Sequence, residues 1–384
     1  MAATLLGSAL TCVSAGYAVA AAVLTRRAGP HAQAPAAAGE VRASVLKPLC
    51  GAEPRLYDNL ATLCRQSVTG YQIVCGVRDP DDPAIAVVRR LQQDFPDTDI
   101  TLVIDPRVHG SNLKVSNLIN LAAHARHDLL VVADSDIAVP PDYLARVAAP
   151  LADPGVGIVT CLYRGRPVDA FWAKLGAQFI DDWFAPSVRI AYAGGSRRFA
   201  FGATIALRRD TLTQIGGFAS LSDRLADDFW LGELTRQAGL RTVLSDVVVT
   251  TDVTETRLPE LWTHELRWLR TIRSLNPAGF AFTFITFTWP MLLAGVALSP
   301  TPVIFATALV GVLARCATAG TIAAALRAPL RDIVLFAEWL QALTGTRVQW
   351  REHVMSVRDA QSAARTHPLS PISSSNGITE KRPL

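Results

Sequence analysis

Pairs of aspartates separated by one residue are the first feature of this sequence that could do chemistry. Three occur: Asp79-Pro80-Asp81, Asp97-Thr98-Asp99 and Asp134-Ser135-Asp136. The second lies in a polar stretch after Phe95-Pro96, where turn formation is enough to explain it. The other two follow the apolar segments "YQIVCGV" and "DLLVVA", which have the character of buried strands. These two pairs are therefore expected at the carboxyl ends of strands.

Carboxylates one residue apart can hold a hard divalent cation against a diphosphate. Mg²⁺ or Mn²⁺ takes one or two protein carboxylates and completes its shell with water and phosphate oxygens. We expect Asp134 and Asp136 to form this site; the alternative is that both pairs are solvated loop carboxylates. A metal-bound diphosphate suits transfer from a sugar nucleotide, because the cation neutralises the leaving group. The P-loop pattern is absent, and no G-x-G-x-x-G follows the first strand.

A later acidic pair, Asp227-Asp228, opens the segment "DDFWLGELTRQAG", which has helical spacing. Aspartate at a helix start satisfies free amides and suits the helix dipole, and Asp227 is the better candidate for this capping role. Asp228 could instead be a general base that takes a proton from an acceptor hydroxyl. The residues alone favour capping and the base role equally.

The segment "HELRWLRTIR" (264–273) carries an arginine at every third position. One interpretation is a basic helix beside a membrane, anchored by Trp262 and Trp268. The other is a functional one, in which an arginine beside an aromatic ring clamps a diphosphate and packs on an acceptor.

Strand and helix patterns alternate from Val41 to about Ala278. Such alternation predicts an α/β domain with a mostly parallel sheet and helices on both faces. Ligands bind such sheets at the carboxyl ends of the strands, so the aspartate clusters should face one crevice. The aromatic-rich region 163–200 has a less regular pattern.

Apolar segments flank this domain. Residues 3–24 carry no charge and are long enough to span a bilayer, and Arg26 and Arg27 follow directly. The positive-inside rule then places the N-terminus outside and the domain in the cytoplasm. Residues 280–298 and 302–326, the second interrupted by Arg315, are expected to leave the cytoplasm and return, and 331–345 to lie on the membrane surface.

These patterns predict six parts. They are an N-terminal transmembrane anchor (1–27), a linker (28–40), a cytoplasmic α/β domain (41–278), two C-terminal transmembrane helices (279–327), an interfacial amphipathic segment (328–366) and a disordered tail (367–384).

Composition narrows the class of protein further. Of the 384 residues 50% are apolar, which favours membrane association, and the net charge of +4 is carried by scattered basic residues. This argues against a dedicated nucleic-acid-binding protein. The six cysteines have no C-x-x-C spacing, so we expect reduced thiols rather than disulfides or a zinc site.

Four motifs follow one another in this sequence: a strand-end aspartate, a D-x-D, a later Asp-Asp and an x-x-x-R-W. Their order resembles the D, D, D, (Q/R)xxRW signature of processive and lipid-modifying inverting glycosyltransferases. The stretches "SVLKPLCGAEPRLYDNL", "VRDPDDPAIAVV", "KVSNL" and "LADDFWLG" look like the ceramide glucosyltransferase family over about residues 43–275. With "GSNLKVSNL", "DSDIAVPPDYL", "FGATIALRRDTL" and "HELRWLRTIR", the sequence is most similar to bacterial hopanoid-biosynthesis-associated glycosyltransferases.

The resemblance implies a GT-A-type domain that uses a UDP-sugar, and it assigns roles by position. Asp82 is the first aspartate, with Asp79 a neighbouring candidate for uridine contact. Asp134 is the second, Asp136 completes the metal pair, and Asp228 is the third, the proposed base. The R-W is Arg267-Trp268; His264 departs from the pattern, which has Gln or Arg there. Lys47 and Lys114, within the quoted stretches, complete the candidate donor-binding residues.

The activity implied by the hopanoid branch is transfer of N-acetylglucosamine from UDP-GlcNAc to bacteriohopanetetrol, with inversion, at the bacterial cytoplasmic membrane. A ceramide glucosyltransferase that uses UDP-glucose is the alternative within enzymes. A non-catalytic membrane scaffold that only binds a nucleotide is the alternative from another class, although it would not need all these elements together.

Overall fold

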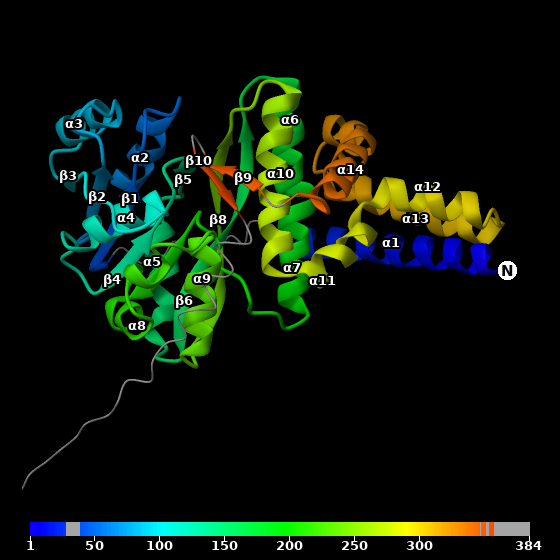
Figure 1. Ribbon diagram of the computed structural model, residues 1–384, viewed down its shortest axis with the longest axis horizontal. Helices are drawn as coiled ribbons and strands as arrows, with labels where there is room; N and C mark the ends of the chain where they lie inside the picture. Colours follow the sequence, from blue (N-terminus) through cyan, green and yellow to red (C-terminus); the bar gives the residue numbers. More distant parts are fainter. Residues whose placement is uncertain (28–38, 346, 351–352, 357–384) are drawn as a thin grey trace, which may run out of the picture.

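The computed structural model describes residues 1–27, 39–345, 347–350 and 353–356. The expected tail, and all but two residues of the expected linker, lie outside the described residues. Three parts follow one another along the molecule in Figure 1: a sheet with its helices, a group of upright helices, and a set of helices that projects away with the N-terminus at its far end.

The first part is built on a mixed eight-stranded sheet with the order β3-β2-β1-β4-β7-β6-β8-β5. Its four leading strands are mutually parallel where they pair, and β7 runs antiparallel to both of its neighbours. The strands are β1 (Ala43–Pro48), β2 (Gln72–Val77), β3 (Asp99–Ile104), β4 (Leu129–Val132), β5 (Ile137–Ala138), β6 (Val156–Pro167), β7 (Ile205–Arg208) and β8 (Arg241–Val253).

Helices cover both faces of this sheet, as the alternating pattern predicted. Successive strand residues point to opposite faces, so Val45 packs in one apolar core and Leu46 in the other. The first core is closed by α2 (Leu56–Cys64), α3 (Ala84–Asp94) and α5 (Tyr143–Ala148). The second is closed by α4 (Leu113–Ala122), α8 (Arg209–Gln214) and α9 (Asp227–Gln237). Short 3-10 turns η1 (Ala149–Ala152) and η3 (Phe218–Leu221) complete the domain.

The strand order reverses between β1 and β4. The chain runs outward from β1 through β2 to β3 and then returns to β4 on the other side of β1. The crevice outside the carboxyl ends of strands at such a reversal is the usual ligand site of an open α/β sheet. Lys47 near the end of β1 and Asp134 just after β4 stand on its two sides.

The aromatic-rich region 163–200, whose sequence pattern is less regular, is mostly helical. It contains α6 (Phe171–Gln178), a π-helical turn η2 (Phe179–Phe184) and α7 (Ala185–Ala193) in direct succession. Its apolar residues pack with those of several other helices, so they form no single stripe of helical period. The π turn also shifts the periodicity partway along.

The second and third parts are helical: α1 (Ala2–Arg27), α10 (Leu258–Leu275), α11 (Pro277–Phe282), the turn η4 (Thr283–Thr286), α12 (Thr288–Leu298), α13 (Pro302–Thr318) and α14 (Ile322–Ala342). A short antiparallel pair, β9 (Arg347–Trp350) and β10 (His353–Ser356), follows. Helices α1, α12 and α13 pack together and project from the rest (Figure 1).

The boundaries of these helices differ from those expected. The segment 302–326 is not one helix: α13 ends at Thr318, Gly320 adopts φ +68°, and Thr321 caps α14, whose axis is bent by 119° from that of α13. The segment 280–298 is likewise bent by 71° between η4 and α12. Among the described residues, Ala2–Arg26 is the one helix long and apolar enough to cross a membrane, or one of three spans if each bent pair is counted as one.

Candidate active site

Asp134 forms the centre of a charged cluster at the carboxyl end of β4. Its Oδ1 lies 2.7 Å from Nζ of Lys114 on α4, and the same Nζ lies 3.3 Å from Oδ2 of Asp227 on α9. Burial lowers the pKa of Lys114, but Asp134, Asp227 and Asp228 outweigh it, so the net pKa lies above its ordinary value. Lys114 therefore stays charged and joins β4 to the start of α9.

Asp136 lies within the same electrostatic field. Its Oδ2 accepts a hydrogen bond from the hydroxyl of Thr251 on β8. Burial, and then the charge of Asp134, raise the pKa of Asp136. Lys47 donates a hydrogen bond from Nζ to the main-chain carbonyl of Asp134, and burial lowers its pKa against the pull of Asp136 and Asp134. The structure thus brings Lys47 and Lys114, two of the candidate donor-binding residues, to the aspartate pair.

The chemistry of this donor set fits a divalent cation. Four carboxylates, those of Asp134, Asp136, Asp227 and Asp228, face the two ammonium groups of Lys47 and Lys114, which leaves an excess of negative charge. No group of three or more His, Cys, Asp or Glu side chains that could hold a metal is found in the described part of the chain. Two carboxylates are nevertheless enough for Mg²⁺ or Mn²⁺ when phosphate oxygens complete the shell. Asp134 and Asp136 are the residues that would hold it.

Asp228, on the first turn of α9, is held by two amides. Its Oδ2 accepts from the Gly202 amide at 3.0 Å and its Oδ1 from the Phe229 amide at 2.8 Å. Burial and then the neighbouring Asp227 raise the pKa of Asp228 to about 6, while Lys114 acts in the opposite direction. A buried carboxylate with this pKa is ionised at neutral pH yet able to accept a proton, as a general base must.

The start of α9 corrects the expected helix cap. The residue at the N-cap position is Ala226, which makes no side-chain cap, and Asp227 pairs with Lys114 instead. Ala226 adopts φ 58° and ψ 58°, the left-handed region that residues other than glycine seldom occupy. Such a conformation at a functional site directs neighbouring side chains at a local energetic cost, and here the neighbours are Asp227 and Asp228.

Asp79 and Asp82 lie in the turn between β2 and α3. Both Asp82 carboxylate oxygens accept from the Gly51 amide at 3.0 Å, and Oδ1 also accepts from the Ala84 amide at 2.8 Å. The Asp79 carboxylate accepts from the amide of Asp81 at 2.9 Å. These bonds order the loops after β1 and β2. No interaction described for Asp79 or Asp82 joins them to Asp134 or Asp136.

The second cluster of expected site residues is on α10. Nδ1 of His264 pairs with Oε1 of Glu255, in the loop before α10. The His264 ring meets the Trp268 ring edge-to-face at a centroid distance of 4.8 Å. Burial raises the pKa of Glu255, but the hydrogen bond and charge of His264, together with main-chain hydrogen bonds, outweigh burial and the net pKa is lowered. Arg267 also makes interactions within the protein.

Tyr163 on β6 connects the two clusters. Its ring lies 6.5 Å from that of Trp268 and 5.1 Å from that of Phe184 on η2, between ring centroids. Burial and then the charges of Asp228, Asp134 and Asp136 raise the pKa of Tyr163, which places its hydroxyl in the field of the aspartate cluster. Tyr163 therefore lies between the residues expected on α10 and the aspartate cluster. The sequence did not indicate this residue.

Four further residues at the site were not singled out by sequence: Gly202, Thr251, Tyr163 and Glu255. Gly202, Thr251 and Tyr163 act through contacts with residues far away in the chain, and Glu255 acts through its contact with His264, nine residues later. No local motif marks any of them. The stretch "FGATIALRRDTL" around Gly202 did enter the family resemblance, and this was the one available signal.

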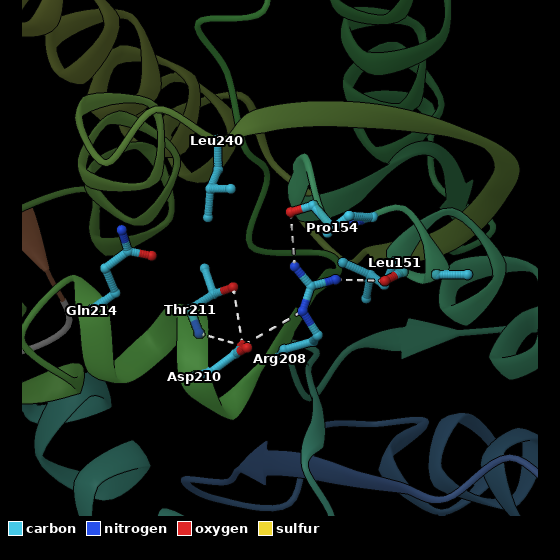
Figure 2. Close-up of a pocket in the computed structure, with 8 residues that line it drawn as sticks. Leu151, Pro154, Arg208, Asp210, Thr211, Gln214 and Leu240 are labelled. Carbon is cyan, nitrogen blue, oxygen red and sulfur yellow. Dashed lines mark hydrogen bonds and ion pairs between the residues drawn. The ribbon is translucent and has the colours of Figure 1, made fainter.

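Two surface pockets lie away from this cluster. Figure 2 shows one of about 410 Å³, where Arg208 donates to the carbonyls of Leu151 and Pro154 and lies 3.4 Å from Asp210. The other, of about 500 Å³, lies near the amino ends of β1 and β3, with Arg42 and Asp99 in its lining. Neither contains an expected site residue.

A mannosyltransferase from Pyrobaculum calidifontis, solved with GDP-mannose and Mn²⁺, has a similar structure. The two align with a TM-score of 0.53 and 21% identity over 91% of this chain and all of that one. Together with the strand order and the aspartate cluster, this likeness defines the class: the protein has the GT-A-type glycosyltransferase fold, which confirms the expected fold.

The family follows from the sequence comparison. The model of glycosyl transferase family 21 matches residues 7–363, and the chain belongs to this family. Curated relatives include ceramide glucosyltransferase 3 of Caenorhabditis elegans, 25% identical over 206 residues, and a ceramide glucosyltransferase of Gibberella zeae, 29% identical over 125 residues. These matches cover 53% and 30% of this chain and only 44% and 24% of the relatives.

Proposed function

We propose that this protein is an inverting membrane glycosyltransferase that moves N-acetylglucosamine from UDP-GlcNAc to a hydroxyl of a hopanoid lipid, bacteriohopanetetrol. Membership of glycosyl transferase family 21 supports sugar transfer. The resemblance of "GSNLKVSNL" and "DSDIAVPPDYL" to the hopanoid branch supports the particular sugar and acceptor. The observation that carries the catalytic part is the cluster in which Asp228, Asp134 and Lys114 meet at the end of β4.

In this proposal Asp228 removes the proton from the acceptor hydroxyl as the oxygen attacks the anomeric carbon. The bond from that carbon to the diphosphate breaks on the opposite side, which inverts the configuration. The Gly202 amide, at 3.0 Å, keeps Oδ2 of Asp228 in place for this role. The raised pKa of Asp228, about 6, makes its carboxylate more basic than an ordinary aspartate and so better able to accept the proton.

The donor occupies the side of the cluster at β4. Lys47 and Lys114 supply positive charge beside the UDP diphosphate, and Asp79 and Asp82 lie in the loop proposed to contact uridine. Asp134 and Asp136 hold a divalent cation, Mg²⁺ or Mn²⁺, which would neutralise the leaving diphosphate. His264, Arg267 and Trp268 on α10 face the acceptor.

The helical part supplies the membrane contact. Large apolar side chains are exposed on α1, α13 and α14, among them Leu5, Val13, Val303, Leu309, Leu313, Ile322 and Leu326. So many exposed apolar side chains suit lipid rather than water. We propose that α1 anchors the chain in the bacterial cytoplasmic membrane, that the helices from α11 to α13 re-enter or cross it, and that α14 lies at its surface. Arg26 at the end of α1 favours a cytoplasmic active site.

A ceramide glucosyltransferase that uses UDP-glucose is the second candidate, because the curated relatives carry that name. The two candidates differ in sugar and acceptor and share the proposed chemistry. The purified protein in lipid nanodiscs should be assayed with UDP-GlcNAc or UDP-glucose against bacteriohopanetetrol or ceramide. Transfer of hexosamine to the hopanoid supports the first candidate, and transfer of glucose to ceramide replaces it with the second. Failure to turn over any UDP-sugar in the presence of metal would support the non-catalytic scaffold.

The catalytic assignment has its own test. Asp228→Asn should lower transfer at least about a hundredfold, the scale of general-base catalysis, while UDP-sugar binding stays near that of the wild type. Wild-type turnover in this variant would remove Asp228 from the mechanism. In the producing cell, mass spectrometry of membrane lipids with and without the gene should show loss of a hexosamine-bearing hopanoid.

A further inference from the structure

Three ionisable side chains outside the aspartate site form a buried cluster between α10 and α14: Arg331, Glu265 and Glu338, of which Glu338 has a pKa raised to about 10 by burial and then by Glu265. The guanidinium of Arg331 donates from Nη1 to Oε1 of Glu265 at 2.9 Å and from Nη2 to Oε2 at 2.7 Å. Nη2 also lies 3.1 Å from Oε2 of Glu338, and Nη1 donates to the carbonyl of Leu175 on α6 at 3.3 Å. The side chains of Arg331, Glu265 and Glu338 are 1%, 4% and 0% exposed.

Stability alone does not account for this cluster. Withdrawing the charged pair of Arg331 and Glu265, together with the carboxyl of Glu338, from water is costly, and well-packed apolar side chains in their place are often as stable or more so. A bidentate guanidinium–carboxylate pair does, however, fix distance and angle more strictly than apolar packing does. The physical benefit of Arg331 is therefore geometric, because it sets how α10 sits against α14 and α6.

Two series of neighbouring residues connect Arg331 with Trp268, one through Glu265 and the other through Phe179. Its partner Glu265 lies directly after His264 and one helical turn before Trp268 on α10. Its guanidinium carbon also lies 5.8 Å from the centroid of the Phe179 ring, and that ring lies 5.5 Å from the ring of Trp268. A shift of Arg331 would move the helix that carries Trp268 and the ring that supports it.

The neighbouring residue on α14 points to different helices. Asp332 pairs with Arg315 on α13, at 2.9 Å between Oδ1 and Nη2, and accepts from the Trp289 amide on α12 at 3.2 Å. Consecutive helical residues point about 100° apart. Helix α14 therefore contacts α10 on one side, through Arg331, and α12 and α13 on another side, through Asp332. Its third side is exposed and apolar, with Ile322, Leu326, Leu330, Ile333 and Leu340 at helical spacing.

We propose that Arg331 is a positioning residue that, through Glu265 and Phe179, holds α10 and Trp268 in the orientation needed for transfer to the lipid acceptor. Through α14 it ties this orientation to the helices that contact the membrane. The expected effect on kcat rests on the proposed function. The expected effect on the orientation of α10 does not, since that orientation can be measured without turnover.

The test compares Arg331→Met, Glu265→Gln and the double variant in the full-length protein in nanodiscs. In Arg331→Met we expect kcat for transfer to lipid to fall by about a hundredfold, the cost of a misplacement of about 1 Å. The KM for the UDP-sugar and the slow transfer of sugar to water should stay at wild-type values, because both depend on the aspartate cluster. The two single effects should not add in the double variant, because both remove the same pair. Arg331→Lys should restore part of kcat.

Arg315→Met is the matched control, because Arg315 is also buried and paired with two carboxylates, those of Asp182 on η2 and Asp332 on α14, neither of which belongs to α10. It should lower the thermal midpoint as Arg331→Met does and keep the wild-type kcat. Amide hydrogen exchange over 258–275 should rise in Arg331→Met and not in Arg315→Met. Unchanged exchange over α10 in Arg331→Met, or an equal loss of lipid transfer and of transfer to water, would overturn the inference. An inactive wild type with this exchange pattern would instead overturn the proposed function alone.

Discussion

The amide of Gly202 and the carboxylate of Asp228 form a hydrogen bond of 3.0 Å across the sheet edge, between the loop before β7 and the start of α9. A side chain at position 202 would crowd two other residues of the site. A Cβ there would lie 2.8 Å from Oδ2 of Asp134 and 3.2 Å from Nζ of Lys114. Glycine thus lets one peptide contact the proposed base while leaving the proposed metal and donor residues in place.

The first prediction follows from this contact. Gly202→Ala should displace Asp134 or the 202 peptide, and so lower transfer by about a hundredfold through misplacement at the reacting centre. Because the strain is local, far-ultraviolet circular dichroism should stay that of the wild type. Gly194→Ala is the control, since a Cβ there would make only ordinary contacts, at 3.4 Å or more. Equal activity of the two variants would contradict the role given to Gly202.

The second prediction concerns pH. Asp228 must be ionised to act as a base, and its pKa is about 6, so kcat should fall below about pH 6 as the carboxylate takes up a proton. Lys114 lowers this pKa, so Lys114→Met should move the acidic limb of the profile to higher pH when measured at saturating donor. A limb that stays in place in Lys114→Met would show that another group controls it.

The raised pKa of Asp228 also makes the stability of the fold depend on pH. Whereas kcat requires the ionised carboxylate, folding is favoured by the protonated form. The folded state binds the Asp228 proton more tightly than the unfolded chain does, because the folded pKa is raised from 3.8 to about 6. Its contribution to folding is therefore fully present below pH 3.8 and is lost as pH rises through about 6. The thermal midpoint of Asp228→Asn should accordingly depend less on pH over this interval than that of the wild type.

The third prediction concerns His264, where the related motif has Gln or Arg. The His264 ring bonds Glu255 through Nδ1 and contacts Trp268. The amide of Gln could donate to Glu255 in the same place, so His264→Gln should keep most of the activity. His264→Ala removes both contacts and should lower kcat by about tenfold, on the scale of one lost hydrogen bond to a charged group. Comparable activity of the Gln and Ala variants would show that the Glu255 contact is not needed.

The sequence anticipated those features that depend on local periodicity. The alternation from Val41 onward predicted the sheet and its helices, and the apolar run before Asp134 placed that residue at a strand end. The spacing of apolar residues and the ends of strands are local properties of the chain. The order of the sheet and its helices follows from them once crossover connections are right-handed. The order of the motifs then indicated candidate site residues in the segments that form α9 and α10.

The features that the sequence did not reveal are those set by distant contacts. Asp227 resembled a helix cap but pairs with Lys114, more than 100 residues earlier, because burial favours an ion pair over a cap. Arg315 suggested an interrupted span, yet it is buried against the carboxylates of Asp182 and Asp332. The partner of a buried charge is chosen by tertiary packing, which composition and spacing do not encode directly.

The fourth prediction concerns the metal. Asp134 and Asp136 supply hard oxygen donors. Burial and then the charge of Asp134 raise the pKa of Asp136, and a divalent cation would favour its ionised form by relieving the repulsion between the two carboxylates. A chelator should therefore abolish transfer, and Mg²⁺ or Mn²⁺ should restore it. Asp136→Asn removes one charge, so it should raise the metal concentration needed for half-maximal activity by tenfold or more, on the order of one lost charged ligand. Asp97→Asn, in the pair assigned to a turn, is the control and should leave the metal requirement unchanged. An enzyme fully active in chelator, or an equal change in both variants, would contradict the metal site at Asp134 and Asp136.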